Sequence, residues 1–500
     1  MKKSSLKVSS DKRFLSDVME FLPSNCLLDK GITGCGGTTV EINSKRHSII
    51  CVPNISLVLN KQSDMVCGVY GKTSIGDIRY YLQNHKGYKK FIVVYDSLKK
   101  LLEVIGSSVY NNYFLLIDEY HILFNSYVLR NYAIKRLLKE YRKFDNFCFM
   151  TATPLDDLTI LKELKDLPII NIEWEAAKKV NIEVENTCFV LSKLKDHINF
   201  SFRSDYNLHI FINSMKSISK TISDMNLEDY KIVCSEDSAL RYKNLNCVKT
   251  VDDVKKINFY TSTCFEGVDI YDPKGKTIII SDSNISTTML DISTMFVQIC
   301  GRLRDSIYKN QVTFILNAKN HRYCKYKSYE EFEAEVKEIV RLAQKETENF
   351  MFHKDADLRR IELMKYCYET YSSVYLIKDE HDNILYDDNL KKIDLKNFDI
   401  VNNIYSSYYS VLDNVNESNL LTVSKTINHN LGDDQIIKLV KQSFNSDKRY
   451  TYDEVMERMR KMVTSFGRSF KQRDLKKYAQ FKIIDTSKNG KRIRLYQIIK

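Results

Sequence analysis

The stretch "LLDKGITGCGGTTVEI" (residues 27–42) combines an apolar strand, a glycine-rich turn and the start of a helix. Backbone N–H groups in such a turn, at the N-terminus of a helix, can bind phosphate oxygens without any side chain. Thr38 stands where a phosphate-binding loop carries the hydroxyl that binds Mg²⁺. The position of the loop lysine is Gly37, and Lys30 is the nearest substitute. Alone, the stretch fits a nucleotide site and a plain glycine-rich turn equally well.

The sequence around this stretch alternates short β-branched and aromatic runs with helical patterns up to about residue 320. Continuous apolar strands separated by amphipathic segments are typical of parallel sheets covered on both faces. Two such sets lie on either side of "DLPIINIEW" (residues 166–174). We therefore predict two tandem α/β domains, at residues 1–170 and 171–320.

The remaining chain changes character twice. Residues 321–445 read as a mostly helical connector with no chemical motif. Residues 446–500 contain two amphipathic helical patterns and then two alternating strands around Asn489-Gly490, which is a strong hairpin signal. Helix, helix and basic hairpin are the layout of a winged helix-turn-helix, so we predict a small C-terminal α+β domain of that type.

The net charge of +12 is concentrated in the same C-terminal segment. Residues 447–500 carry 16 Lys and Arg against six Asp and Glu. Such an excess indicates a polyanion partner, although a solvated basic face would look the same in composition. In a winged helix the hairpin residues that would contact phosphates are Lys488, Lys491, Arg492 and Arg494.

The bulk composition is that of an intracellular globular protein. Of 500 residues, 43% are hydrophobic and 28% are charged, which allows a sizeable core. The twelve cysteines form no C-x-x-C pair and no regular spacing, as expected for reduced thiols. The N-terminus lacks the apolar region of a signal peptide, and no uncharged apolar run approaches the length that spans a bilayer. We predict a cytoplasmic protein with no membrane partner.

The motif "FLLIDEYH" (residues 114–121) places two adjacent carboxylates at the end of an apolar strand, where open α/β sheets bind ligands. Asp118 would hold Mg²⁺, and Glu119 would orient and deprotonate an attacking water. This division of roles fits metal-assisted hydrolysis of a phosphoanhydride. An isolated acidic pair at a strand end is common, so the motif needs support from the rest of the chain.

Further motifs follow in order. They are "MTATP" (residues 150–154), "HIFINS" (209–214), "STCFEGVDI" (262–270) and "QICGRLRD" (298–305). With the glycine loop and D-E-x-H, this ordered set resembles the motifs of the superfamily 2 helicases over residues 25–320. The closing Q-x-x-G-R-x-R looks most like that of viral replication-origin-binding helicases.

The resemblance implies two RecA-like P-loop domains with ATP and Mg²⁺ in the cleft between them. Glu119 and Asp118 would act on the water and the metal, while Arg302, Arg304 and Gln298 would reach the γ-phosphate. Residues that would bind the nucleotide are Lys30, Gly31, Thr33, Gly34, Cys35, Gly36, Gly37, Thr38 and Thr39, with Gly267 and Asp269 from the second domain. His121, Thr151 and Thr153 would couple the cleft to the nucleic-acid groove. Pro53 and Asn54 would contact the nucleic-acid strand.

Together these features predict an ATP-dependent DNA helicase or translocase that acts in viral, phage or mobile-element replication. Its partners would be single- or double-stranded DNA and other replication proteins. The alternative is a catalytically weak or inactive DNA-binding protein that keeps the helicase fold, which Gly37 in place of the lysine would favour. A restriction-type or primase-linked motor is disfavoured, because the sequence shows no nuclease constellation.

Overall fold

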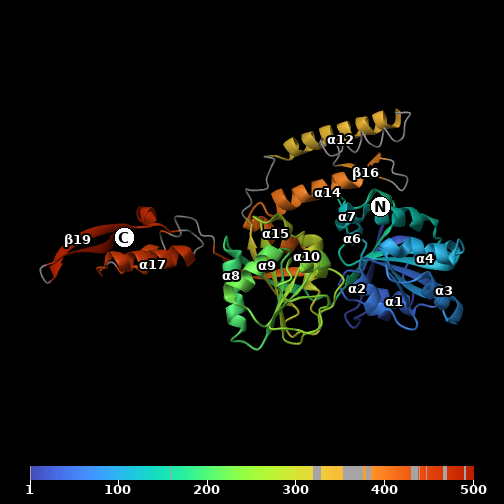
Figure 1. The fold of residues 1–500 in the computed structure, drawn as a ribbon, viewed down its shortest axis with the longest axis horizontal. Helices are drawn as coiled ribbons and strands as arrows, with labels where there is room; N and C mark the ends of the chain where they lie inside the picture. Colours follow the sequence, from blue (N-terminus) through green and yellow to red (C-terminus); the bar gives the residue numbers. More distant parts are fainter. Residues whose placement is uncertain are drawn as a thin grey trace.

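The chain forms two eight-stranded sheets in which neighbouring strands run parallel, and each sheet has helices on both faces. Figure 1 shows these two α/β units side by side, with the C-terminal segment set apart from them. The computed structural model describes residues 2–157, 159–318, 328–352, 375–378, 384–429, 437, 440–445, 447–465, 470–488 and 491–499. Two such sheets in tandem are the architecture of RecA-like domains, as the sequence predicts.

The first sheet has the strand order β1-β8-β2-β7-β6-β3-β5-β4. Its central strands are buried along their whole length, which explains why they read as continuous apolar runs. The strands are β1 Lys3–Val8, β2 Cys26–Asp29, β3 His47–Val52, β4 Cys67–Val69, β5 Lys90–Val94, β6 Tyr113–Asp118, β7 Phe147–Thr151 and β8 Ile169–Trp174. The helices are α1 Gly37–Asn43, α2 Ile55–Lys61, α3 Ile75–Asn84, α4 Leu98–Ile105, α5 Val109–Asn112, α6 His121–Asn125 and α7 Tyr127–Glu140.

The second sheet has the order β12-β11-β13-β10-β14-β15-β9-β18. Its strands are β9 Val180–Asn186, β10 Asn207–Phe211, β11 Tyr230–Val233, β12 Cys247–Val248, β13 Ile257–Tyr260, β14 Gly275–Asp282, β15 Gln311–Asn317 and β18 Leu421–Asn428. Its helices are α8 Val190–Ser201, α9 Met215–Met225, α10 Glu236–Arg241, α11 Val297–Cys300 and α15 Tyr408–Glu417. Helices α8 and α9 pack on one face, while α11 and α15 pack on the other.

The domain limits in the structure differ from the predicted ones at two places. Strand β8 belongs to the first sheet, so that sheet ends at Trp174 and not near residue 170. Strand β18, inside the segment that the sequence assigns to the helical connector, is the edge strand of the second sheet and pairs in parallel with β9. Its partner lies some 242 residues earlier in the chain, so no local pattern could reveal the pairing.

Helix α14 (Asp388–Asp399) lies across both α/β domains, below the long helix α12 (Tyr329–Phe352) in Figure 1. Lys392 Nζ donates to the carbonyl of Ile160 in the first domain at 2.6 Å. Lys396 Nζ lies 3.7 Å from Asp156 in the first domain and 3.3 Å from Asp291 in the second. The helix is therefore a strap that contacts both domains at once. The short strands β16 Leu376–Lys378 and β17 Ile384–Tyr386 precede it.

Asp387 anchors the start of this strap, and we expect Asp387→Ala to lower the free energy of unfolding by about 2–4 kcal/mol. The buried carboxylate caps α14 through the Asn389 N–H at 2.9 Å, accepts from the Tyr127 hydroxyl at 2.7 Å and lies 2.8 Å from Lys135 Nζ. Its loss leaves the buried Tyr127 hydroxyl without that acceptor. Thermal or denaturant unfolding measures the change.

Asp388→Ala is the matched control. This neighbouring carboxylate is partly exposed and pairs with Lys391 one turn along the same helix. Partly exposed pairs of this kind contribute at most about 1 kcal/mol. Equal destabilisation by the two substitutions would contradict an anchoring role for Asp387.

The C-terminal segment forms a small α+β unit from α17 (Tyr452–Ser465), α18 (Leu475–Tyr478) and the antiparallel pair β19 (Gln480–Lys488) and β20 (Lys491–Ile499). Val455, Met459 and Val463 of α17 pack with Ile498 of the hairpin. The second predicted helix is short, a 3-10 turn followed by α18. The Asn489-Gly490 turn and the side chains of Lys488, Lys491 and Arg492 lie outside the description, whereas Arg494 is exposed. The winged-helix assignment stays a prediction. In the part of the chain that the structure describes, no helix is both long and apolar enough to cross a bilayer.

Candidate nucleotide site

The glycine loop follows β2 and turns directly into α1. Gly31, Gly34 and Gly36 have positive φ angles of 74°, 75° and 81°, which L side chains rarely adopt. A Cβ on Gly31 would overlap the Ile172 carbonyl, and Trp174 Nε1 donates to the Lys30 carbonyl at 2.8 Å. Strand β8 therefore holds one side of the loop in place. The glycines are needed for this turn, as expected for a phosphate cradle.

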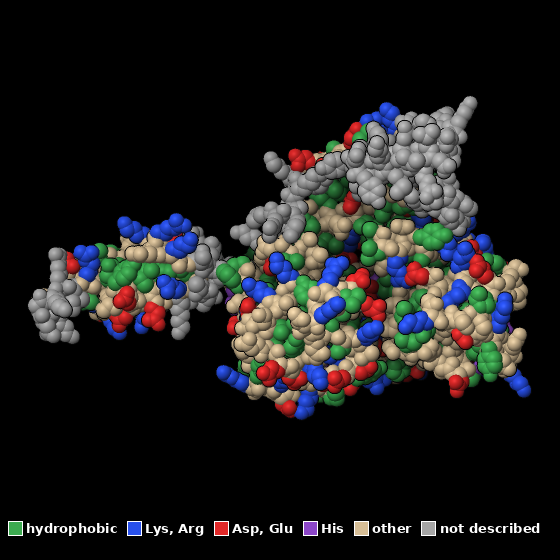
Figure 2. Space-filling model, in the orientation of Figure 1, with side chains coloured by type: hydrophobic (Ala, Val, Ile, Leu, Met, Phe, Trp, Pro, Cys, Tyr) green, Lys and Arg blue, Asp and Glu red, His purple; other side chains and the backbone are tan. Residues whose placement is uncertain are grey.

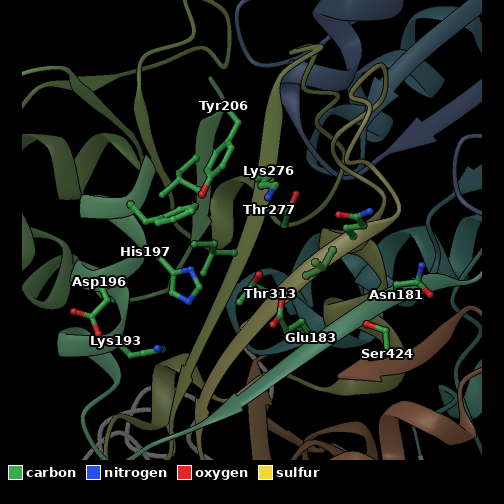
Figure 3. A pocket seen from close by; sticks show the side chains of 15 residues that line it. Asn181, Glu183, Lys193, Asp196, His197, Tyr206, Lys276, Thr277, Thr313 and Ser424 are labelled. Atoms are coloured by element: carbon green, nitrogen blue, oxygen red, sulfur yellow. The ribbon is translucent and has the colours of Figure 1, made fainter. Parts of the chain in front are cut away.

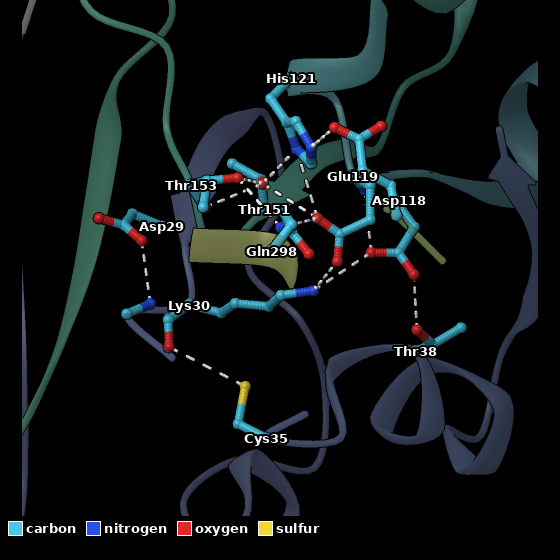
Figure 4. Close-up of polar contacts among 12 residues, drawn as sticks. Asp29, Lys30, Cys35, Thr38, Asp118, Glu119, His121, Thr151, Thr153 and Gln298 are labelled. Carbon is cyan, nitrogen blue, oxygen red and sulfur yellow. Dashed lines mark hydrogen bonds and ion pairs between the residues drawn. The ribbon is translucent and has the colours of Figure 1, made fainter. Parts of the chain in front are cut away.

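Thr38 and Asp118 meet at the mouth of the loop. Thr38, in the first turn of α1, donates from Oγ1 to Asp118 Oδ2 at 2.6 Å (Figure 4). A hydroxyl and a carboxylate are oxygen ligands of the kind that Mg²⁺ prefers. These two side chains thus fit the predicted metal site. The next residue, Glu119, has a φ of 53°, an uncommon conformation for a non-glycine residue and one that often marks a functional site.

Lys30 reaches these carboxylates from the end of β2. Its Nζ lies 2.6 Å from Glu119 Oε1 and 3.6 Å from Asp118 Oδ1, and the side chain is buried. Burial alone would lower the pKa of Lys30, but Glu119 and Asp118 outweigh it and raise that pKa above its ordinary value. Lys30 is therefore a protonated cation inside the predicted site.

The other oxygen of Glu119 is held by side chains from both domains. Thr151 donates to Glu119 Oε2 at 3.1 Å, and Gln298 of the second domain donates to the same oxygen at 3.3 Å. Gln298 also donates to Thr153 at 3.1 Å. Burial would raise the pKa of Glu119, yet Lys30 and His121 overcome it and lower that pKa. A second-domain residue thus lies directly against the predicted base.

His121 links the same network to Glu266, a residue that the sequence motifs did not mark as part of the site. His121 Nδ1 lies 2.8 Å from Thr151 Oγ1, and its Nε2 lies 3.2 Å from Glu266 Oε1 in the second domain. Asn125 Nδ2 also contacts Glu266, at 3.4 Å. Glu266 directly precedes Gly267 in the "FEGVD" motif, and its place in that motif is what could have indicated a role in the site.

The two arginines of "QICGRLRD" have different surroundings. Arg302 is buried and donates to the Gln298 and Val268 carbonyls and to Gln298 Oε1, at 2.8, 3.1 and 2.7 Å. Burial lowers the pKa of Arg302 to about 10. Arg304 is held by Asp269 Oδ1 at 2.6 Å, and a Cβ on Gly34 would overlap its guanidinium. Arg304 is therefore the arginine that reaches the glycine loop from the second domain.

The other predicted loop residues line the same junction. A Cβ on Gly301 would overlap Thr33, so the two motifs pack closely. Thr39 is exposed on the first turn of α1. Cys35 is buried beneath the loop, where burial raises the pKa of its thiol to about 11. This thiol is therefore protonated and serves as packing beneath the loop.

The residues predicted to contact a nucleic-acid strand have other partners in this structure. Asn54 caps α2, because its side chain accepts from the Leu57 N–H at 3.0 Å. Gly267, with a φ of 73°, lies so close that a Cβ there would be 2.7 Å from Asn54 Nδ2. The Pro53 carbonyl accepts from Arg130 at 2.6 Å. These contacts place the loop at the domain junction.

A pocket of about 600 Å³ lies elsewhere, on the α8 side of the second sheet (Figure 3). Its wall includes Lys276, whose Nζ lies 4.3 Å from the ring centroid of Tyr206, and His197, which contacts Glu185 at 2.9 Å. No residue of the predicted nucleotide site lines it.

No protein-family model and no curated protein sequence matches the chain. Solved structures of similar fold include Mycobacterium smegmatis helicase Lhr bound to ssDNA and AMP-PNP, with 13% identity, a TM-score of 0.42, and 73% of this chain and 56% of that chain covered. Mss116p bound to ssRNA and AMP-PNP has 12% identity and a TM-score of 0.45, with 81% of this chain and 95% of that chain covered. The Pyrococcus furiosus Hef helicase domain has 12% identity and a TM-score of 0.35, with 61% of this chain and 96% of that chain covered.

The chain spans little more than half the length of the Lhr structure. Identities and TM-scores are low in all three comparisons, so the fold assignment rests on the topology of the chain's own sheets. These sheets define a protein of the tandem RecA-like class. Glu119 of the first domain and Gln298 of the second meet between its two domains.

Proposed function

We propose that the chain hydrolyses ATP with Mg²⁺ between its RecA-like domains and uses the reaction to move along or separate DNA, as a superfamily 2 helicase or translocase. The observation that carries this proposal is the convergence at Glu119. First-domain Lys30 and Thr151 and second-domain Gln298 all contact its carboxylate. An arrangement that needs both domains makes hydrolysis depend on their closure, which a motor requires.

The roles follow from the positions. Thr38 and Asp118 would hold Mg²⁺, which neutralises phosphate oxygens when bound. Glu119, oriented by Thr151 and Gln298, would accept the proton of the attacking water. Arg304 would stabilise the charge that develops on the transferred phosphoryl group, since it alone of the two arginines reaches the loop.

Coupling to nucleic acid would use the contacts across the domain junction. His121 touches Thr151 beside Glu119 and also Glu266 of the second domain. A change in the distance between the domains therefore alters the surroundings of the base. The resemblance of "QICGRLR" to origin-binding helicases supports a role in viral, phage or mobile-element replication, in the cytoplasm of the cell concerned.

Phosphate release by the purified protein, with and without single-stranded DNA, duplex DNA and RNA, tests the proposal. We expect release that requires Mg²⁺ and that DNA stimulates more than RNA. Stimulation by RNA alone would replace DNA by RNA as the proposed substrate, and the proposal of an ATP-driven motor would stand. Absence of release under all conditions would favour the inactive DNA-binding protein that Gly37 suggested.

The C-terminal unit supplies a separate prediction. In Figure 2, most of the visible Lys and Arg side chains of this unit lie along its upper edge, with a few among the acidic side chains of the lower edge. Deleting residues 447–500 should weaken DNA binding by about tenfold or more at low salt and flatten its salt dependence, since each lost phosphate contact removes about 0.9 from the log–log slope. Fluorescence anisotropy at several salt concentrations measures both.

Two full-length variants control for loss of the whole unit. Exposed basic residues are replaced by Gln in the C-terminal unit, at Arg473, Lys476, Lys482 and Arg494, and separately on α9, at Lys216 and Lys220. Only the first set should lower the affinity and the slope. Unchanged DNA affinity after the deletion and after the first set would exclude the C-terminal unit as the DNA contact.

A further inference from the structure

The space that a lysine at position 37 would enter is filled. A Cβ on Gly37 would overlap Met150 Sδ and lie 2.7 Å from Met150 Cε and 3.4 Å from Leu15 Cδ1. Met150 is fully buried on β7, directly before Thr151. Gly37 does not have a positive φ, so its backbone suits any residue. A side chain at this position would therefore have to displace the end of the Met150 side chain, and the backbone itself is no obstacle.

A cation is nevertheless present at the mouth of the loop. Lys30 Nζ lies 2.6 Å from Glu119 and 3.6 Å from Asp118, and Asp118 accepts from Thr38 in the first turn of α1 (Figure 4). The lysine side chain thus ends beside the residues that would hold Mg²⁺ and the water. Lys30 lies between the two carboxylates to which the proposed function assigns the metal and the water.

We propose that the phosphate-binding lysine of this loop has moved from the helix start to the preceding strand end, so that Lys30 contacts the terminal phosphates while Met150 occupies the vacated space. This inference rests on the proposed ATP site. Before nucleotide binds, Lys30 is paired with Glu119, and binding transfers it to phosphate. The same movement frees Glu119 for water. Residues 30, 37 and 150 therefore form one structural set at the loop.

Another lysine could be chosen from sequence pattern alone. Lys72 lies in "GVYGKT" (residues 68–73), which contains the Gly-Lys-Thr of a phosphate loop. Its side chain is exposed, in the loop between β4 and α3. Lys72 is thus a matched control, because it lies in a similar local motif but not beside Asp118 and Glu119 as Lys30 does.

Nucleotide affinity tests the proposal without relying on turnover. All variants carry Glu119→Gln, which prevents consumption of nucleotide and removes the carboxylate charge that Lys30→Met would leave unpaired. Binding of a fluorescent mant-ATP with Mg²⁺ should weaken about 10- to 100-fold in Lys30→Met, the range of a lost hydrogen bond to a charged group. Lys72→Met should bind as the Glu119→Gln parent does. Melting temperatures without nucleotide verify that each variant is folded.

Relocating the lysine completes the test. In the Lys30→Met background, Gly37→Lys combined with Met150→Ala should restore the affinity to within about threefold of the parent, since the regained contact is of the same kind. Gly37→Lys with Met150 retained should restore less, because the new side chain overlaps the end of Met150. Met150→Ala without a lysine at position 37 should not restore binding.

Two results would overturn the inference. One is a folded Lys30→Met variant that binds mant-ATP as tightly as the parent. The other is restoration by Met150→Ala alone, which would show that space and not charge limits binding. If the wild-type protein still releases phosphate in either case, the proposed function stands and only the role of Lys30 falls. A wild-type protein that neither binds nor hydrolyses nucleotide would overturn both proposals.

Discussion

Replacing Glu119 by Gln is expected to reduce DNA-stimulated phosphate release by about 10²–10⁴-fold, the usual contribution of a general base. The substitution keeps the shape of the side chain and can keep its contacts with Thr151 and Gln298, but it removes the group that accepts the proton of water. Binding of mant-ATP should persist. Parallel measurements of steady-state release and of nucleotide affinity separate a loss of chemistry from a loss of binding.

Glu103→Gln is the corresponding control, because this glutamate is exposed on α4 and pairs with Lys99 one turn away. Its phosphate release should equal that of the wild type. A Glu119→Gln protein with wild-type turnover would exclude Glu119 as the base and would move the search to another acid near Asp118.

Replacing Arg304 by Ala is expected to lower turnover by about 10³-fold or more, as loss of an arginine finger does in other phosphoryl-transfer sites. Arg304 is partly exposed, is oriented by Asp269 and lies against Gly34. Removing it leaves the hydrophobic cores of both domains intact, so the melting temperature should change little. Steady-state phosphate release at saturating nucleotide, together with thermal unfolding, measures the two effects.

Arg302→Ala should lower the stability of the protein more than Arg304→Ala does, and its turnover less. The buried guanidinium makes three hydrogen bonds within the second domain, and its loss leaves the Val268 carbonyl and Gln298 without these partners. Each such loss costs about 1–3 kcal/mol, so the second domain should melt at a lower temperature. Equal loss of stability in the two variants, with equal activity, would contradict the division of roles between the arginines.

Much of the fold could be predicted because it depends on local patterns. Strands such as β6 and β7 are buried on both faces, so they appear in the sequence as unbroken apolar runs that end in Asp118 and Thr151. Parallel strands bring such ends to the same edge of a sheet, which places the motif residues near one another. The convergence of Glu119 with Thr151 follows from that rule, whereas the contact of Thr153 with Gln298 crosses the two domains and was expected only from the resemblance of the ordered motifs.

The remaining features depend on contacts between distant segments. The contact of Lys30 with Glu119 depends on the direction of its side chain at the end of β2. The overlap that a side chain at position 37 would meet comes from Met150, more than a hundred residues later. The strap helix α14 contacts both domains through Lys392 and Lys396, which in the sequence are two ordinary helical lysines. Spacing along the chain carries no information about such partners.

The late position of β18 has a consequence for synthesis of the protein. The first sheet is complete once Trp174 has left the ribosome, but the outer edge of β9 stays unpaired until residues 421–428 emerge. At usual rates of translation this interval lasts about 12–50 s. An unpaired strand edge can pair with other chains, so nascent second domains on one messenger are prone to associate during this time. Chaperone dependence during expression, and aggregation of proteins truncated before residue 421, would be its visible signs.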